Sequence, residues 1–522
     1  MSIATLPLGR VLMVQGTTSD AGKSTLVAAL CRLLTNAGYR VAPFKAQNMS
    51  NNAAVTADGG EVGRAQAMQA AAARIAVTVE MNPVLLKPQA DNSSQIVVLG
   101  KARRVANARE FYALKAELWP IVTAALDRLR AEYDVVVIEG AGSPAEINLA
   151  QYDIVNMRVA RYADAPVLLV GDIDRGGVFA SLYGTHALLP ESDAARIQGF
   201  IINKFRGDPT LLDSGFEMLQ ARTGVPTLGV VPYMDLSRIP AEDALAWDAL
   251  RARNATTKHL DIAIARLPRI ANLDEFQPLI AEPDVSVRFV ASAAELGAPD
   301  LIIVPGTKST IDDLEWLDRT GLVAEIRARN ASGTPVLGIC GGFQMLGTRI
   351  IDESGAERAG DVPGLGLLPV TTYFIGEKVT RRVEARVATS TSLWNTEDSA
   401  SLADAPLDGY EIHMGRTRVN DGARVGAPPF SVRADAEHSA DGCTSIDGLI
   451  VGTYIHGLLE NDALRDALLH RLATRKGIRR SPVARRTTLD DAFNELARVV
   501  GEHVDLAAIA KIADLPLLAG VS

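Results

Sequence analysis

The sequence predicts an α/β protein with two doubly wound domains, each built on a mainly parallel sheet. Three observations support this: short apolar runs recur along the chain, turn residues bound each run, and segments with a helical pattern separate them. Such runs are typical of buried parallel strands in βαβ units. The predicted strands are residues 11–15, 134–138, 166–170, 199–202, 261–266, 300–304, 335–339 and 448–453.

The chain length also favours more than one domain. A chain of 522 residues exceeds what a single hydrophobic core usually organises. The polar stretch 248–259 interrupts the strand pattern, which restarts at Leu260. We therefore predict a first domain over residues 1–250 and a second over 251–461. The charged, helical remainder, 462–522, is expected to pack on the chain.

The composition is typical of a globular protein, with 48% apolar and 22% charged residues. A net charge of −9 argues weakly against nucleic acid or an anionic membrane as a partner. Three cysteines suit a reducing compartment, and no apolar run approaches the roughly 18 residues of a membrane span. No secretory signal is recognisable. We expect a cytoplasmic protein that binds neither nucleic acid nor a membrane. Its oligomeric state stays open.

A glycine-rich turn follows the first predicted strand and precedes a helical pattern. Strand, turn and helix form the context in which backbone N–H groups cradle phosphate. Lys23 is expected to reach the terminal phosphates and Ser24 to hold Mg²⁺. Five residues separate Gly16 from Gly22, one more than in the common motif. The expected ATP contacts in this loop are Gly16, Thr17, Asp20, Gly22, Lys23, Ser24 and Thr25.

Charged residues follow other predicted strands of the first domain. Glu139 ends an apolar run, at the edge where ligands bind in open parallel sheets, and is expected to coordinate Mg²⁺ opposite Ser24. Lys45 ends a further short strand, and Arg175 lies in the segment GDIDRGG. Either cation is expected to neutralise phosphate or a substrate carboxylate.

The second domain carries a cysteine at a sharp strand-to-helix turn. The spacing Gly338-x-Cys340-x-Gly342 is that of a nucleophile elbow, and a helix N-terminus there favours the thiolate. Its base should be a histidine distant in sequence. We choose His456, which lies at a glycine turn after an apolar run. His413, in GYEIHMG, is either a substrate-side residue or a structural one.

This domain resembles class I glutamine amidotransferases, which have a flavodoxin-like fold. The resemblance implies that Cys340 attacks the amide of glutamine and that His456 shuttles protons to release ammonia. It also implies an oxyanion hole formed by the backbone N–H groups of Gly341 and a residue near Gly306. Most such domains carry Glu two residues after the histidine, where this chain has Leu458. That departure suggests a Cys–His dyad.

The longer phosphate loop resembles that of dethiobiotin synthetase and its amide-forming relatives, whose domain is P-loop NTPase-like. These enzymes phosphorylate a carboxylate and let nitrogen attack the acyl phosphate. Asn203, after a predicted strand, resembles their base-recognising asparagine. A further Mg²⁺ ligand is expected from Asp58 or Glu61, with no choice between them.

Several motifs together resemble the adenosylcobyric acid synthases over nearly the whole chain. They are QGTTSDAGKS at 15–24, KAQNMSNN at 45–52 and GGEVGRAQ at 59–66. The resemblance implies amidation of the b, d, e and g carboxylates of adenosylcobyrinic acid a,c-diamide, a corrinoid. The resemblance also implies that ATP and glutamine are consumed and that Mg²⁺ is bound.

Two alternatives remain open at this point. The first is cobyrinic acid a,c-diamide synthase, which performs the same chemistry on the a and c groups. The second is a P-loop ATPase switch of the partitioning type. Such switches carry a signature lysine after the first glycine of the loop, where this chain has Thr17, and they have no use for a glutaminase domain.

Overall fold

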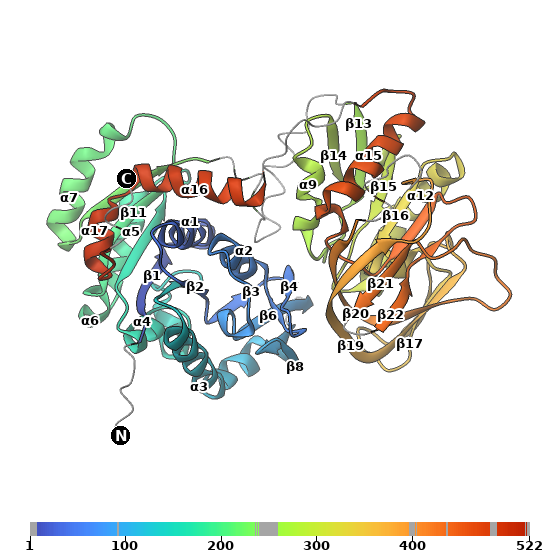
Figure 1. The fold of residues 1–522 in the computed structure, drawn as a ribbon. Helices are drawn as coiled ribbons and strands as arrows, with labels where there is room; N and C mark the ends of the chain where they lie inside the picture. Colours follow the sequence, from blue (N-terminus) through green and yellow to red (C-terminus); the bar gives the residue numbers. More distant parts are fainter. Residues whose placement is uncertain are drawn as a thin grey trace, which may run out of the picture. The chain divides into compact units, whose positions relative to one another are not determined.

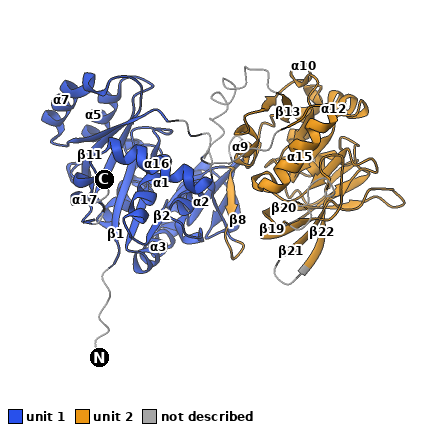
Figure 2. Cartoon of the chain, turned by 45° about the horizontal axis from the view of Figure 1, so that its top comes forward, with its two compact units in different colours: residues 1–50, 60–242, 486–522 blue, residues 51–59, 243–485 orange. Residues whose placement is uncertain are grey.

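The computed structural model divides the chain into two compact units (Figure 2). Unit 1 comprises residues 1–50, 60–242 and 486–522, and unit 2 comprises 51–59 and 243–485. The residues that the structure describes are 8–90, 93–234, 236, 239, 259–395, 402, 405–434, 437–480, 488–516 and 518.

Unit 1 is built on a six-stranded sheet in the order β12-β11-β10-β1-β9-β2, in which every neighbouring pair is parallel. The apolar runs predicted as strands in this half are confirmed, with ends that differ by a few residues. Later strands lie on both sides of β1, so the loop after β1 opens at the middle of the carboxyl edge, where ligands bind. The strands are β1 (Arg10–Gly16), β2 (Val41–Phe44), β9 (Val135–Glu139), β10 (Val167–Asp172), β11 (Ile197–Phe205) and β12 (Thr227–Pro232).

Helices and a small second sheet complete the first part of unit 1. The helices are α1 (Lys23–Asn36), α2 (Arg64–Ala72), α3 (Ala108–Glu132), α4 (Met157–Ala163), α5 (Val178–Leu188), α6 (Glu191–Ala194) and α7 (Asp213–Thr223). The small sheet has the order β3-β6-β7-β8. Its strands and the short β5 are β3 (Gln47–Met49), β5 (Glu61–Gly63), β6 (Val84–Ala90), β7 (Ser93–Val98) and β8 (Lys101–Asn107).

The C-terminal segment returns to unit 1 as α16 (Leu489–His503) and α17 (Leu506–Ile512). Figure 1 shows α16 beside α1, and its buried apolar side chains, such as Phe493 and Leu496, belong to the same core as those of α1. The expected single C-terminal segment, 462–522, is therefore divided: 462–485 belongs to unit 2 and 486–522 to unit 1. An amphipathic helix must bury its apolar face, and α16 does so against unit 1.

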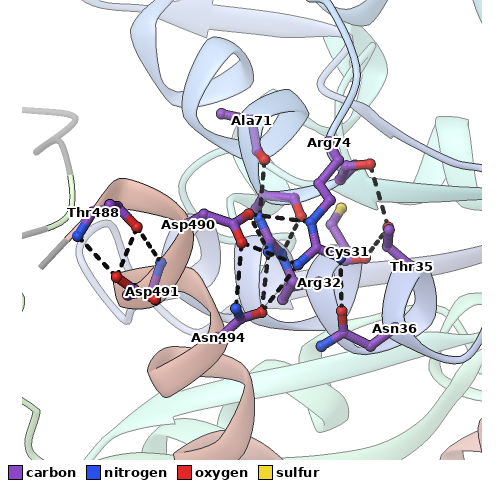
Figure 3. Close-up of polar contacts among 12 residues, drawn as sticks. Cys31, Arg32, Thr35, Asn36, Ala71, Arg74, Thr488, Asp490, Asp491 and Asn494 are labelled. Atoms are coloured by element: carbon purple, nitrogen blue, oxygen red, sulfur yellow. Dashed lines mark hydrogen bonds and ion pairs between the residues drawn. The ribbon is translucent and has the colours of Figure 1, made fainter.

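An ion pair between a buried arginine and a half-exposed aspartate accompanies this return (Figure 3). Arg32 of α1 is fully buried, and its Nη1 donates to Oδ1 of Asp490 at 2.6 Å and to Oδ1 of Asn494 at 3.0 Å. Arg74, just after α2, donates to both oxygens of the same aspartate at 3.1 Å. One carboxylate of α16 therefore holds the ends of two neighbouring helices together.

Unit 2 is built on a second parallel sheet in the order β14-β13-β15-β16-β24-β23, with only the short edge strand β23 antiparallel. The runs predicted as strands in this half are confirmed as β13, β15, β16 and β24. The strands are β13 (Leu260–Ala265), β14 (Val285–Val290), β15 (Leu301–Val304), β16 (Val336–Ile339), β23 (Cys443–Thr444) and β24 (Ile450–Thr453).

A mostly antiparallel sheet, which the sequence did not predict, lies beside the parallel one in unit 2. Its order is β18-β17-β19-β21-β22, with β20 paired to β19. The strands are β17 (Arg349–Asp352), β18 (Gly360–Pro363), β19 (Val370–Val387), β20 (Leu407–Val419), β21 (Phe430–Ala434) and β22 (Glu437–Asp441). The unit also contains β4 (Ala53–Val55), α9 (Gln277–Ile280), α10 (Ala293–Leu296), α11 (Thr310–Arg319), α12 (Leu322–Ala331), α13 (Gly341–Leu346) and α15 (Asp462–Arg475). Among the described helices, none has the length and apolar character needed to cross a membrane.

Candidate functional site

The glycine-rich loop of unit 1 connects β1 to α1. Gly22 caps α1 with a positive φ of 95°, and a Cβ there would overlap Nδ2 of Asn203. Lys23 is buried, and its Nζ donates to the carbonyl oxygens of Thr18 at 2.8 Å and Gly142 at 3.2 Å. The lysine is thus folded back over the loop, where a phosphate would meet its charge.

Three of the predicted residues converge at the carboxyl edge of the sheet. Glu139 ends β9 and is fully buried. Ser24 Oγ donates to its Oε1 at 2.8 Å, and Lys45 Nζ lies 2.7 Å from the same oxygen. They meet because β1 and β2 flank β9, so the segments that leave β1 and β2 pass either side of Glu139. Gln69, which sequence reasoning missed, donates to Oε2 at 2.5 Å.

These residues fit a magnesium ion held together with nucleotide phosphates. A hydroxyl and a carboxylate 2.8 Å apart are hard oxygen donors of the kind that Mg²⁺ prefers. In the part of the chain that the structure describes, no cluster of three or more His, Cys, Asp and Glu side chains could hold a metal by itself. A site that draws its remaining ligands from phosphate and water needs no such cluster.

The other predicted contacts of unit 1 lie around the loop. Asn203 donates from Nδ2 to the carbonyl oxygen of Ala21 at 2.9 Å, so this amide supports the loop. The contact of Asn203 with the nucleotide base stays a prediction. Arg175 lies 3.5 Å from Asp20 and is largely exposed. Thr17 is buried at the start of the loop.

The two alternative magnesium ligands each have a partner of their own. Glu61 is buried and forms an ion pair with Lys87. Asp58, which belongs to unit 2, accepts a hydrogen bond from Thr56. The choice between these carboxylates therefore stays open.

The predicted elbow in unit 2 has the sharp turn that its spacing indicates. β16 ends at Ile339 and α13 begins at Gly341. Cys340, between them, has φ 51° and ψ −109°, a strained combination for a residue with a side chain. The turn holds the sulfur at the start of α13.

His456 lies directly beside this cysteine. A Cβ added to Gly306 would come within 2.9 Å of Cε1 of His456 and 3.7 Å of Cβ of Cys340, so only glycine fits between them. The ring of Tyr410 stacks on the imidazole with centroids 5.2 Å apart. The predicted nucleophile, base and oxyanion-hole glycines Gly306 and Gly341 thus meet at one place.

A carboxylate that the sequence did not predict faces the other side of the imidazole. Oε2 of Glu275, in the 3₁₀ turn Leu273–Phe276, lies 3.3 Å from Nδ1 of His456, and both residues are buried. The expected Cys–His dyad is therefore extended to three groups. The residue two positions after the histidine, Leu458, has no part in this because the acid comes from a distant segment. The only sequence signal for Glu275 is its place after the predicted strand that forms β13.

The neighbours of His456 determine its charge. Burial lowers the pKa of His456, but the charges of Glu275 and Cys340 outweigh this and raise the pKa to about 10. A carboxylate accepts only, so the imidazolium directs its Nδ1–H at Glu275, while Nδ2 of Asn272 lies 3.3 Å from the same nitrogen. At neutral pH the site therefore favours an imidazolium at His456.

His413 is held by its own surroundings. Its Nδ1 lies 2.9 Å from the carbonyl oxygen of Gly415, and its ring stacks on Tyr454 with centroids 3.9 Å apart. Nε2 lies 3.8 Å from Glu411. These contacts favour the structural reading of the two that the sequence left open.

Sequence comparisons assign a different family to each half of the chain. Residues 12–246 match the family described as the CobQ/CobB/MinD/ParA nucleotide binding domain. Residues 261–464 match the CobB/CobQ-like glutamine amidotransferase domain. One chain therefore carries a nucleotide-binding domain and a glutamine amidotransferase domain, the two parts of a glutamine-hydrolysing, amide-forming ligase.

Curated relatives match the chain over almost its full length. A cobyric acid synthase of Sorangium cellulosum is 51% identical and covers 97% of this chain and 98% of its own. Those of Yersinia enterocolitica and Pelotomaculum thermopropionicum are 48% and 46% identical, covering 96% and 98% of this chain and 97% of their own. The chain belongs to the cobyric acid synthase family.

Proposed function

We propose that this protein amidates the b, d, e and g carboxylates of adenosylcobyrinic acid a,c-diamide to give adenosylcobyric acid. ATP activates each carboxylate, and glutamine supplies the nitrogen. The observation that carries the proposal is the pairing of two reaction centres in one chain. Lys45 and Ser24 converge on Glu139 in unit 1, and Cys340 contacts His456 in unit 2. The full-length identity to cobyric acid synthases supports the choice of a corrinoid substrate.

Ammonia is made in unit 2. The Cys340 thiolate attacks the amide carbon of glutamine, and the imidazolium of His456 gives its proton to the departing ammonia. This leaves a glutamyl thioester. His456 then takes a proton from water as the water attacks the thioester and the Cys340 thiolate leaves; the carboxyl group formed gives its remaining proton to solvent and departs as glutamate. Glu275, at Nδ1, stabilises the imidazolium during both steps.

Amide formation takes place in unit 1. A substrate carboxylate oxygen attacks the γ-phosphorus of ATP, which releases ADP and leaves an acyl phosphate. Lys23 and Lys45 offset the negative charge that gathers on the phosphoryl oxygens. Ammonia attacks the acyl carbon, phosphate leaves, and the proton lost from nitrogen is taken up by the phosphate. Mg²⁺, held by Ser24 and Glu139 when it is bound, supplies further charge neutralisation at the phosphates.

The test follows product masses after the protein is mixed with adenosylcobyrinic acid a,c-diamide, Mg-ATP and glutamine. Stepwise gain of four amides is expected. Cys340→Ala should abolish the reaction with glutamine and retain it with ammonium chloride, whereas Lys23→Ala should abolish both. Conversion of cobyrinic acid instead of its a,c-diamide would assign the chain to a,c-diamide synthesis. ATP hydrolysis with no corrinoid change and no glutamine turnover would favour a partitioning-type switch.

A further inference from the structure

A row of buried side-chain amides leads to the acidic group of the ATP site. Gln69 of α2 donates from Nε2 to Oε2 of Glu139 at 2.5 Å. Gln66, one turn earlier, donates to Oε1 of Gln69 at 3.5 Å, and Asn48 of β3 donates to Oε1 of Gln66 at 3.3 Å. Gln66 and Gln69 are fully buried and Asn48 is 3% exposed. The amides form a continuous chain that ends at Glu139.

The charge of Glu139 fixes the direction of this chain. An ionised carboxylate only accepts hydrogen bonds, so the NH₂ group of Gln69 must face it. The carbonyl oxygen of Gln69 then faces the NH₂ group of Gln66, whose own oxygen faces Asn48. The oxygen of Asn48 in turn accepts from the backbone N–H of Met49 at 2.9 Å. No amide in the row can flip without placing two donors or two acceptors against each other.

The row controls how Glu139 presents its second oxygen. Ser24 and Lys45 both engage Oε1, while Gln69 engages Oε2. Gln69 also donates to the backbone oxygen of Ser24 at 3.3 Å. The carboxylate therefore cannot rotate about its terminal bond without losing contacts on both oxygens. A fixed carboxylate keeps the Ser24 hydroxyl hydrogen directed at Glu139 and its lone pairs directed toward the phosphate side.

We propose that Gln69 is a positioning residue for the ATP-dependent half of the reaction, with Gln66 and Asn48 holding it in place. It orients Glu139 and Ser24 so that they can accept Mg²⁺ and the nucleotide phosphates together. Asn48 follows Lys45 by three residues, so the row also ties the segment that carries Lys45 to α2. This inference rests on the proposed function only for the identity of the final substrate.

Two variants of the full-length protein test the inference. Gln69→Leu has a similar size and no donor, and Gln69→Glu is isosteric but places an acceptor against Glu139. Gln198→Leu, on the exposed surface of unit 1, is the matched control. ATP binding is measured by calorimetry with and without Mg²⁺, because this readout needs neither corrinoid nor turnover. Glutamine hydrolysis and the thermal midpoint are measured on the same samples.

The wild-type protein should bind ATP more tightly with Mg²⁺ than without it. Gln69→Leu should bind ATP as tightly as the wild type when Mg²⁺ is absent. The increase in ATP affinity that Mg²⁺ causes should be about tenfold smaller in this variant, because residues that hold a metal ligand in place act on this scale. The increase should be smaller still in Gln69→Glu. Ligation kcat should fall while glutamine hydrolysis stays at the control level. The inference is overturned if Mg²⁺ increases the ATP affinity of Gln69→Leu as much as that of the wild type. It is also overturned if glutamine hydrolysis and the thermal midpoint of Gln69→Leu fall along with ATP affinity, because the substitution then damages the whole protein. If the wild type leaves the corrinoid unchanged, the proposed function fails, but the calorimetry still decides the role of Gln69.

Discussion

Glu275 lies 3.3 Å from Nδ1 of His456, although 181 residues separate them in the sequence. Both side chains are buried, and the 3₁₀ turn that carries Glu275 follows β13 rather than β24. The acid thus comes from a different part of unit 2 than position 458, where most class I glutamine amidotransferases carry their glutamate. The position of Leu458 is free for apolar packing, and it is indeed buried in the core of the unit.

Glu275→Gln should lower kcat for glutamine hydrolysis by about 100-fold, because a neutral neighbour stabilises the imidazolium less. Since the charge of Glu275 raises the pKa of His456, its removal should also move the loss of imidazolium to lower pH. Glutamate release measured across pH checks both effects. Glu353→Gln, an exposed acid in the same unit, is the control. A variant with wild-type kcat and an unchanged pH profile would show that Glu275 has no catalytic part.

Lys45→Met should abolish ligation and also destabilise unit 1. Lys45 and Glu139 are both buried, so losing the lysine leaves a buried carboxylate without its countercharge, at a cost of about 3–5 kcal/mol. The double variant Lys45→Met/Glu139→Gln should recover much of this stability without recovering ligation. Chemical denaturation and product masses measure the two effects. Equal stability of the single and double variants would contradict the explanation.

The sequence predicts a site residue well when a regular element brings it to the site. Lys23, Ser24 and Glu139 follow apolar strands of one parallel sheet, and parallel strands share a carboxyl edge, so their meeting follows from the pattern. Cys340 and His456 follow β16 and β24, which are also neighbours.

Residues positioned by long-range packing gave no such signal. Glu275 lies in a short turn, and Gln69 lies within an alanine-rich helix whose buried face is set by its neighbours. The pairing of β19 with β20 joins segments whose register depends on tertiary packing, which local pattern does not specify. The return of α16 to unit 1 likewise depends on partners more than 450 residues away.

The stability of unit 2 should fall as pH rises because of Glu357. Burial raises the pKa of this carboxyl to about 7, against the hydrogen bonds from Thr310 that lower it. The folded state therefore binds a proton that the unfolded state has released between about pH 4.5 and pH 7. Folding is favoured below this window, and that contribution is lost as pH rises through it. Glu357→Gln should flatten the unfolding free energy across the window, as measured by urea denaturation. An identical pH profile for both proteins would rule out this origin.

The contact between Arg32 and Asp490 should be needed for the stability of unit 1 (Figure 3). Arg32 is fully buried on the helix that begins with Lys23, so Asp490→Ala leaves its Nη1 with a single acceptor, Asn494, among the contacts drawn. A weakened buried charged donor costs about 1–3 kcal/mol, and Arg74 loses the same partner. We expect a lower thermal midpoint and weaker ATP binding, with glutamine hydrolysis retained because unit 2 has its own core. Glu495→Gln on the exposed side of α16 is the control, since its partner Arg498 lies on the same helix. If Asp490→Ala and the control had equal midpoints and equal ATP affinity, α16 would be held by its apolar face alone.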